Sequence, residues 1–176
     1  MSDGVQIHGN LFSPKTDSSK LPLIIFVNSW VLEEHEYFAQ AKKLAEKGYL
    51  VFSYSTRGWG CSGGKVDVIG PRDIADLETV LDWLEKETPV DVKNIGMSGI
   101  SYGGGMSLMA AAKVDRIKTV AAMSAWGNLA DAVYGNNTPR QFWSSVLIST
   151  GAIIGEVDFK LLKLFKALIF NFLLIS

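Results

Sequence analysis

Apolar and polar residues alternate along the first 125 positions with two different periods. Alternation of apolar and polar residues predicts a half-exposed strand at residues 5–11. Apolar runs of strand length predict further strands at residues 21–27, 49–54, 94–98 and 119–124. Helical spacing predicts helices at residues 33–47, from Pro71 to Leu84, and at 102–113. Strands that alternate with helices predict an α/β protein, with a mostly parallel sheet covered by helices on both faces.

The alternation stops after Ala125. Residues 135–139 form a turn pattern, and the rest is typical of helical or irregular structure. From Phe159 to Ile175 the chain is apolar on every side if it is helical, so it has no polar face for solvent. We therefore divide the chain into a core at residues 1–135 and a helical, cap-like region with an apolar tail at residues 136–176.

Composition narrows the class of protein. The chain has 176 residues, 48% of them hydrophobic, with 17 basic and 18 acidic side chains. This balance excludes intrinsic disorder and gives no support for a nucleic-acid or anionic membrane surface. A single cysteine, Cys61, and a polar N-terminus without an apolar signal region indicate a reducing compartment, so we expect a cytoplasmic protein. The apolar tail is shorter than the ~20 residues that span a bilayer.

The segment Gly99-Ile100-Ser101-Tyr102-Gly103 fits G-x-S-x-G, the pattern of a nucleophile elbow. A predicted strand precedes Ser101 and a helix of small residues follows it, as that motif requires. The glycines let strand and helix pass close together, and the turn presents the serine hydroxyl at a helix N-terminus, where backbone N–H groups favour an oxyanion. The alternative is a glycine-rich turn with an inert serine.

Three stretches resemble the N-terminal part of an α/β-hydrolase of the Xaa-Pro dipeptidyl-peptidase and cocaine-esterase-like acyl esterase group. They are SDGVQIHGNLFSPK, YSTRGWGCSGG and NIGMSGISYGG, and the resemblance covers about residues 2–140. It implies an α/β-hydrolase fold and hydrolysis of a small ester or peptide by acyl transfer, without a cofactor or metal. Ser101 would be the nucleophile.

The same resemblance suggests which residues form the oxyanion hole and which residue holds the loop at residues 54–64 in place. The backbone N–H of Tyr102 would be one donor, and Trp30 stands where the esterase group has a tyrosine that supplies the other. Either the indole or the backbone N–H of Trp30 could donate, and packing against the loop is the alternative role. Arg57 is expected to anchor its loop. Ser55 replaces the aspartate usual in that loop, which puts a salt bridge there in doubt.

A serine nucleophile needs a base, and the order in this fold is serine, acid, histidine. The two histidines, His8 and His35, both precede Ser101. His8 falls in the first predicted strand, and we expect His35 on the surface rather than as a replacement base. Asp131 could be an acid only in a variant arrangement. We therefore expect an incomplete hydrolase, truncated before its last strands, with residues 119–124 as an exposed sheet edge.

Two other functions remain possible hypotheses. A non-catalytic interaction module would pair through the exposed edge and the apolar tail with a copy of itself or with a complementing chain. Membrane-surface attachment would use residues 160–175. Among hydrolases, a dienelactone-hydrolase-like enzyme is the alternative, although such enzymes carry cysteine at the elbow where this chain has Ser101.

Overall fold

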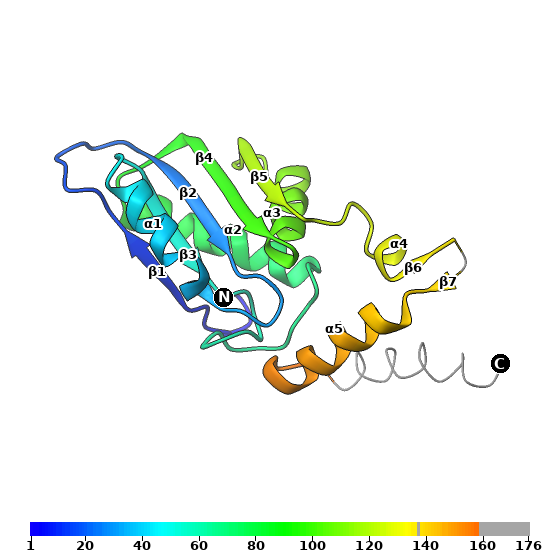
Figure 1. Ribbon diagram of the computed structural model, residues 1–176. Coiled ribbons are helices and arrows are strands. Elements are labelled where there is room, and N and C mark those ends of the chain that lie inside the picture. Colours follow the sequence, from blue (N-terminus) through cyan, green and yellow to red (C-terminus); the bar gives the residue numbers. More distant parts are fainter. Residues whose placement is uncertain (137, 159–176) are drawn as a thin grey trace.

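A computed structural model describes residues 1–136 and 138–158 of the chain. Its main feature is a five-stranded sheet in the order β1-β3-β2-β4-β5 (Figure 1). The strands are β1 Gly9–Phe12, β2 Leu21–Val27, β3 Leu50–Tyr54, β4 Val90–Ile100 and β5 Thr119–Met123. Only β1 pairs antiparallel, with β3, and the other pairs are parallel. The mostly parallel sheet is therefore confirmed.

Helices cover both faces of this sheet (Figure 1). The 3-10 helix η1 Glu34–Tyr37 leads into α1 Phe38–Ala45 on one face, while α2 Pro71–Glu87 and α3 Tyr102–Lys113 lie on the other. The chain then forms α4 Leu129–Val133, a small hairpin of β6 Tyr134–Gly135 and β7 Thr138–Pro139, and α5 Gln141–Ile154. The two helices agree with the helical or irregular structure expected after Ala125, and the hairpin lies where residues 135–139 were expected to turn. The division into a core and a cap-like region stays a prediction.

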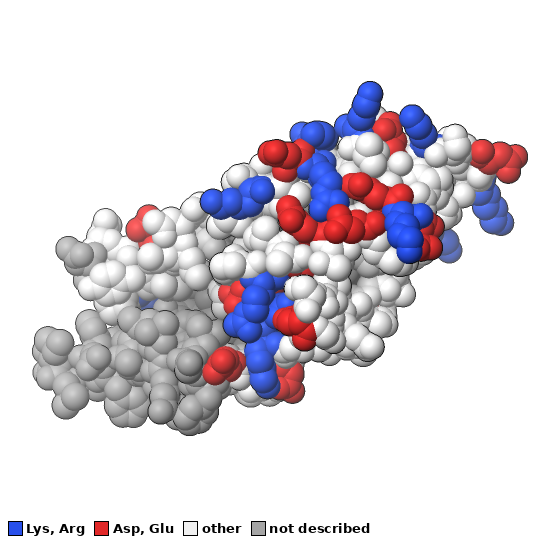
Figure 2. Space-filling view, turned by 180° about the vertical axis from the view of Figure 1, so that it is seen from behind, with Lys and Arg blue, Asp and Glu red and all other residues white. Residues whose placement is uncertain are grey.

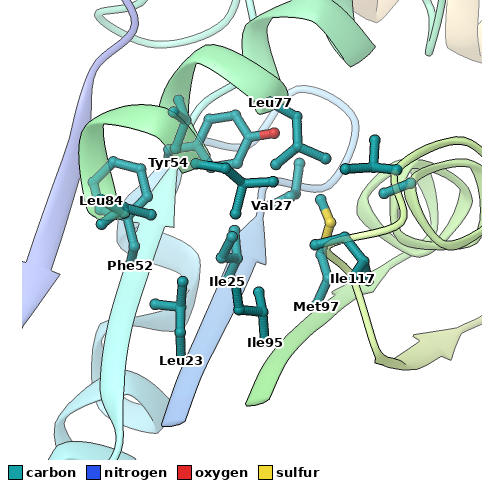
Figure 3. Close-up of a cluster of buried hydrophobic side chains, with 14 of the residues drawn as sticks. Leu23, Ile25, Val27, Phe52, Tyr54, Leu77, Leu84, Ile95, Met97 and Ile117 are labelled. Atoms are coloured by element: carbon teal, nitrogen blue, oxygen red, sulfur yellow. The ribbon is translucent and has the colours of Figure 1, made fainter. Parts of the chain in front are cut away.

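The larger core lies between the sheet and the helices α2 and α3 (Figure 3). Alternate residues of β2, among them Leu23 and Ile25, point into it and are fully buried. On the opposite face of β2, Phe26 stacks on Tyr37 with ring centroids 4.7 Å apart. A strand buried on both faces must be apolar at every position, which explains the continuous run LPLIIFV.

The first strand is shorter than predicted, because β1 begins at Gly9 and residues 5–8 do not join the sheet. These residues bond instead to the loop after β3: the N–H of His8 donates to Ser62 Oγ at 2.9 Å, and the N–H of Gly63 donates to the Gln6 carbonyl at 2.9 Å. The placement of His8 within a strand was therefore wrong. Alternation cannot distinguish pairing with a strand from pairing with a loop.

Strand β5 is an outer strand of the described sheet, as predicted. Its residues alternate between exposed and half-buried, and the side chain of Met123 is 46% exposed. The predicted apolar tail from Phe159 to Ile175 lies outside the described residues. Within the described ranges, no helix has the length and apolar character needed to cross a membrane.

Candidate active site

Ser101 is the single residue between the end of β4 and the start of α3. Its backbone has φ 55° and ψ −112°, a conformation that is sterically costly for a residue with a side chain. The backbone N–H of Ser101 donates to the Met123 carbonyl at 2.8 Å, and its carbonyl accepts from the Gly105 N–H at 2.9 Å. The end of β5 and the first turn of α3 therefore hold the serine in this strained turn.

The two glycines of the motif allow strand and helix to pass close together. A Cβ added at Gly99 would lie 2.5 Å from the carbonyl carbon of Gly103, and one added at Gly103 would lie 2.2 Å from the Val27 oxygen. Both distances are far below van der Waals contact, so no side chain fits at either position. The geometry predicted for the elbow from its glycine spacing is present.

Tyr102 and Trp30 lie next to each other beside this turn, with ring centroids 5.6 Å apart. Tyr102 opens α3, so its backbone N–H belongs to the helix-terminal set that has no carbonyl partner within the helix. The indole N–H of Trp30 donates to the Leu147 carbonyl at 3.1 Å and lies 3.3 Å from Thr150 Oγ1, both on α5. Of the two donors that Trp30 offers, the indole is thus already engaged.

The loop after β2 is tied directly to the residue before the serine. Ser29 Oγ lies 2.7 Å from a carboxylate oxygen of Glu36 and 3.1 Å from the Ile100 carbonyl, and the Ser29 N–H donates to the Glu36 carboxylate at 2.8 Å. The Ile100 N–H donates to the Tyr37 hydroxyl at 3.0 Å. Burial of that hydroxyl raises the pKa of Tyr37. These contacts fix the loop against the elbow, and our sequence analysis missed them.

A buried polar group lies behind the elbow. The hydroxyl of the fully buried Tyr102 donates to Asp73 Oδ2 at 3.1 Å and lies 3.4 Å from Thr56 Oγ1. The same Asp73 oxygen accepts from the Ile69 N–H at 2.8 Å. Burial raises the pKa of Asp73 to about 7. In the described part of the chain, Asp73 Oδ1 has no hydrogen-bond partner.

The sequence analysis placed Asp73 within the helix predicted from Pro71 to Leu84 and gave it no further role. Its position four residues before Leu77, on the face of α2 that includes Leu81 and Leu84, places it on the buried side of that helix. An acidic residue on an apolar helix face is the signal that would have identified it.

Arg57 anchors its loop, as expected. Its guanidinium makes two bonds of 2.7 Å to the Asp76 carboxylate and one of 3.0 Å to Asp3. The bonds to Asp76 raise the pKa of Arg57 above its ordinary value. Ser55 forms no such salt bridge, and its hydroxyl bonds to the buried carboxylate of Glu34. Although burial opposes ionisation, this bond and the nearby His8 hold the pKa of Glu34 below its usual value.

A cavity of about 550 Å³ opens beside Ser101, between the elbow and the helices α4 and α5. Most of its walls are apolar or aromatic and come from the segment after β5. The wall residues include Trp30, Trp126, Leu129, Trp143, Leu147 and Ile148. The structure therefore brings together Ser101 and Trp30 at one cavity, with Tyr102 directly behind them.

Neither histidine lines this cavity. His8 Nδ1 lies 2.8 Å from Glu34 Oε1, and the exposed His35, within η1, lies 3.5 Å from the same oxygen. Ligand atoms of Glu33, Glu34 and His35 lie within 4.8 Å of one another, so this group could hold a cation, but it does not line the cavity.

The acidic residues that follow Ser101 in the chain do not line the cavity either. They are Asp115, Asp131, Glu156 and Asp158. No acid–histidine pair therefore lies at Ser101 within the described residues, 1–136 and 138–158.

Residues 3–152 match the model of a family described as X-Pro dipeptidyl-peptidase (S15 family). The chain belongs to this family. The match includes the five-stranded sheet and the elbow, so the predicted resemblance to this group is confirmed.

A sequence relative and two solved structures are similar to this chain. Protein YcjY of Escherichia coli (strain K12), which is uncharacterised, is 32% identical over 123 residues, which are 65% of this chain and 39% of that protein. Est1E from Butyrivibrio proteoclasticus, solved with ferulic acid, is 27% identical with a TM-score of 0.61, over 70% of this chain and 50% of that one. The alpha/beta hydrolase GrgF from Penicillium is 25% identical with a TM-score of 0.58, over 67% and 41%.

These comparisons confirm the α/β-hydrolase fold of the S15 chain. The chain spans 31–39% of the length of the first curated relatives that it matches.

Proposed function

We propose that this chain carries the nucleophile of a serine hydrolase that cleaves an ester or amide by acyl transfer. The observation that supports this most is the backbone of Ser101, which is held at φ 55° between β4 and α3 beside an apolar cavity. Strain of this kind persists only where the surrounding structure imposes it. Membership of the S15 family supports the same reaction class.

In the proposed reaction, Ser101 Oγ bonds to the acyl carbon while the hydroxyl proton passes to a base. The leaving group departs with a proton, and water then releases the acyl group from the serine. We propose that the base comes from outside the described residues, because neither described histidine lines the cavity.

We assign the oxyanion hole to two backbone groups. The Tyr102 N–H is one, since it lies at the start of α3. The backbone N–H of Trp30 is the other, since the indole N–H of that residue already donates to α5. Packing of the indole against α5 and Tyr102 would keep this backbone group at the elbow.

A fluorophosphonate probe tests the nucleophile. We expect slow labelling of the folded wild type, mapped by peptide mass to Ser101, and none in Ser101→Ala. Because loss of the base from a triad lowers reactivity by several orders of magnitude, excess probe and long incubation are needed. Ser124→Ala is the matched control, since Ser124 lines the same cavity and also has a positive φ, 50°.

Ser124→Ala should label like the wild type. Equal labelling of Ser101→Ala, or a folded wild type with no adduct on Ser101, would refute the proposed function.

A further inference from the structure

The cavity beside Ser101 has walls that select for apolar, aromatic ligands. Three of the five tryptophans of the chain, Trp30, Trp126 and Trp143, contribute to it. Between them lie aliphatic residues such as Leu129 and Ile148. Tryptophan rings supply large apolar area and favour contact with another ring. A ligand that fills this space would bury mainly carbon.

A single charged side chain, Arg140, lines this cavity among the described residues. It lies between the β6–β7 hairpin and α5: its backbone N–H donates to the Val133 carbonyl at 2.9 Å, and its guanidinium packs over Gly135, where an added Cβ would lie 3.3 Å from Nη2. No carboxylate pairs with the guanidinium in residues 1–136 and 138–158. Arg140 is therefore a cation at the edge of an apolar cavity and makes no ion pair with the described carboxylates.

The start of α5 adds to this positive potential. Arg140 is the N-cap of that 14-residue helix, and no side chain caps its first N–H groups. Gln141, the first residue of α5, also lines the cavity. The partial positive charge of a helix N-terminus favours an anion at the same place as the guanidinium.

Helix α5 supplies no competing charge. On the face that Figure 2 shows, most charged side chains gather over the sheet and its helices, and the described part of the opposite end shows few. The sequence of α5, QFWSSVLISTGAII, contains no charged residue. A carboxylate at the exposed Arg140 would thus meet no anion from this helix.

We propose that the cavity binds an apolar, aromatic ligand that carries a carboxylate, with the carboxylate at Arg140 and the ring among the tryptophans. This inference rests on the proposed function, because it names the substrate class of the same site. That class is esters with an anionic aromatic portion. It also favours one charge type over the other. In the described ranges no acidic side chain lines the cavity to pair with the N-terminal ammonium of a peptide, whereas Arg140 can pair with an anion.

Direct binding tests the charge preference without any turnover. We would measure quenching of tryptophan fluorescence by 3-phenylpropionate, its neutral amide and 3-phenylpropylammonium, in the wild type and in Ser101→Ala. The carboxylate should bind about 3- to 5-fold more tightly than the amide, as expected for a pair formed with an exposed guanidinium, and the ammonium more weakly than both. Binding should survive in Ser101→Ala, so the result is independent of whether the serine reacts.

Substitution at Arg140 identifies the cation. Arg140→Gln should reduce carboxylate binding to the level of the amide and leave the amide unchanged, whereas Arg140→Lys should keep part of the preference. Lys113→Gln, which removes an exposed charge from α3, is the matched control. Equal affinity for the carboxylate and the ammonium, or an unchanged preference in folded Arg140→Gln, would overturn the inference. If binding behaves as expected but no probe adduct forms on Ser101, the cavity assignment stands and the proposed function fails.

Discussion

At the residue scale, Asp73 shows that ionising a carboxyl buried behind the elbow costs free energy. The carboxyl is 1% exposed and directly contacts the hydroxyl of Tyr102. Deprotonation would place a negative charge in a nearly dry environment and behind the residue whose N–H we assign to the oxyanion hole. The neutral acid is the form that this environment favours, which is why the pKa of Asp73 is raised to about 7.

The raised pKa predicts a contribution to stability that decreases with rising pH. The unfolded chain loses the Asp73 proton near its ordinary pKa of 3.8, while the folded protein retains it up to about 7. The contribution is therefore complete below pH ~4 and lost as the pH rises to ~7, on the order of 4 kcal/mol in total. Asp73→Asn, which is neutral at every pH, should become more stable relative to the wild type across this window.

Urea unfolding at pH 5 and pH 8 measures this difference. Asp115→Asn, at an exposed carboxylate, controls for the change of residue type. Parallel loss of stability in the wild type and in Asp73→Asn would show that the raised pKa is not real.

At the element scale, the loop after β3 is joined to α2 by the buried pair of Arg57 and Asp76. Their side chains are 3% and 5% exposed. Removing one partner from a buried pair leaves a charge without compensation, which costs ~3–5 kcal/mol, whereas exposed pairs contribute ~1 kcal/mol or less. The loop therefore depends on this pair for its position beside the elbow.

We expect Arg57→Met to lower the free energy of unfolding by ~3–5 kcal/mol. Arg116→Met is the matched control, because Arg116 bonds the more exposed Asp82 at 2.6 Å on the surface, and it should cost ~1 kcal/mol or less. Denaturant unfolding of both variants gives the comparison. An equal cost for the two would contradict the anchoring role.

Elements with a strong pattern were predictable from sequence. β2 and α3 have the predicted bounds, because a strand buried on both faces and a helix that follows an elbow leave little freedom in residue type. Contacts that depend on distant segments were not predictable. The pairing of His8 with Glu34, the clamp of Ser29 on Ile100 and the use of the Trp30 indole by α5 join residues 26 to 117 positions apart. Hydrophobic periodicity carries no information about such pairs.

At the scale of the whole molecule, one edge of the sheet is open at β5 in the described residues. In the described ranges β5 pairs with β4 alone, and no proline, charge or bulge interrupts TVAAM. Unprotected edges of this kind recruit further strands. When no other strand is supplied, we expect a second copy of the chain to pair with this edge.

Sedimentation over a range of concentrations should show association of the wild type at tens of micromolar. Ala121→Lys places a charge on β5 and should reduce association. Ala111→Lys makes the same change on the exposed face of α3 and should have no effect. A monomeric wild type throughout the range would contradict the expectation.

One hydrogen bond links this edge to the chemistry. The carbonyl that accepts from the Ser101 N–H belongs to Met123, the last residue of β5. A strand that docks along β5 would thus lie one backbone hydrogen bond away from the nucleophile. By thermodynamic reciprocity, a partner strand that changes the equilibrium constant for acylation of Ser101 must be bound more or less tightly, by the same factor, once the serine is acylated.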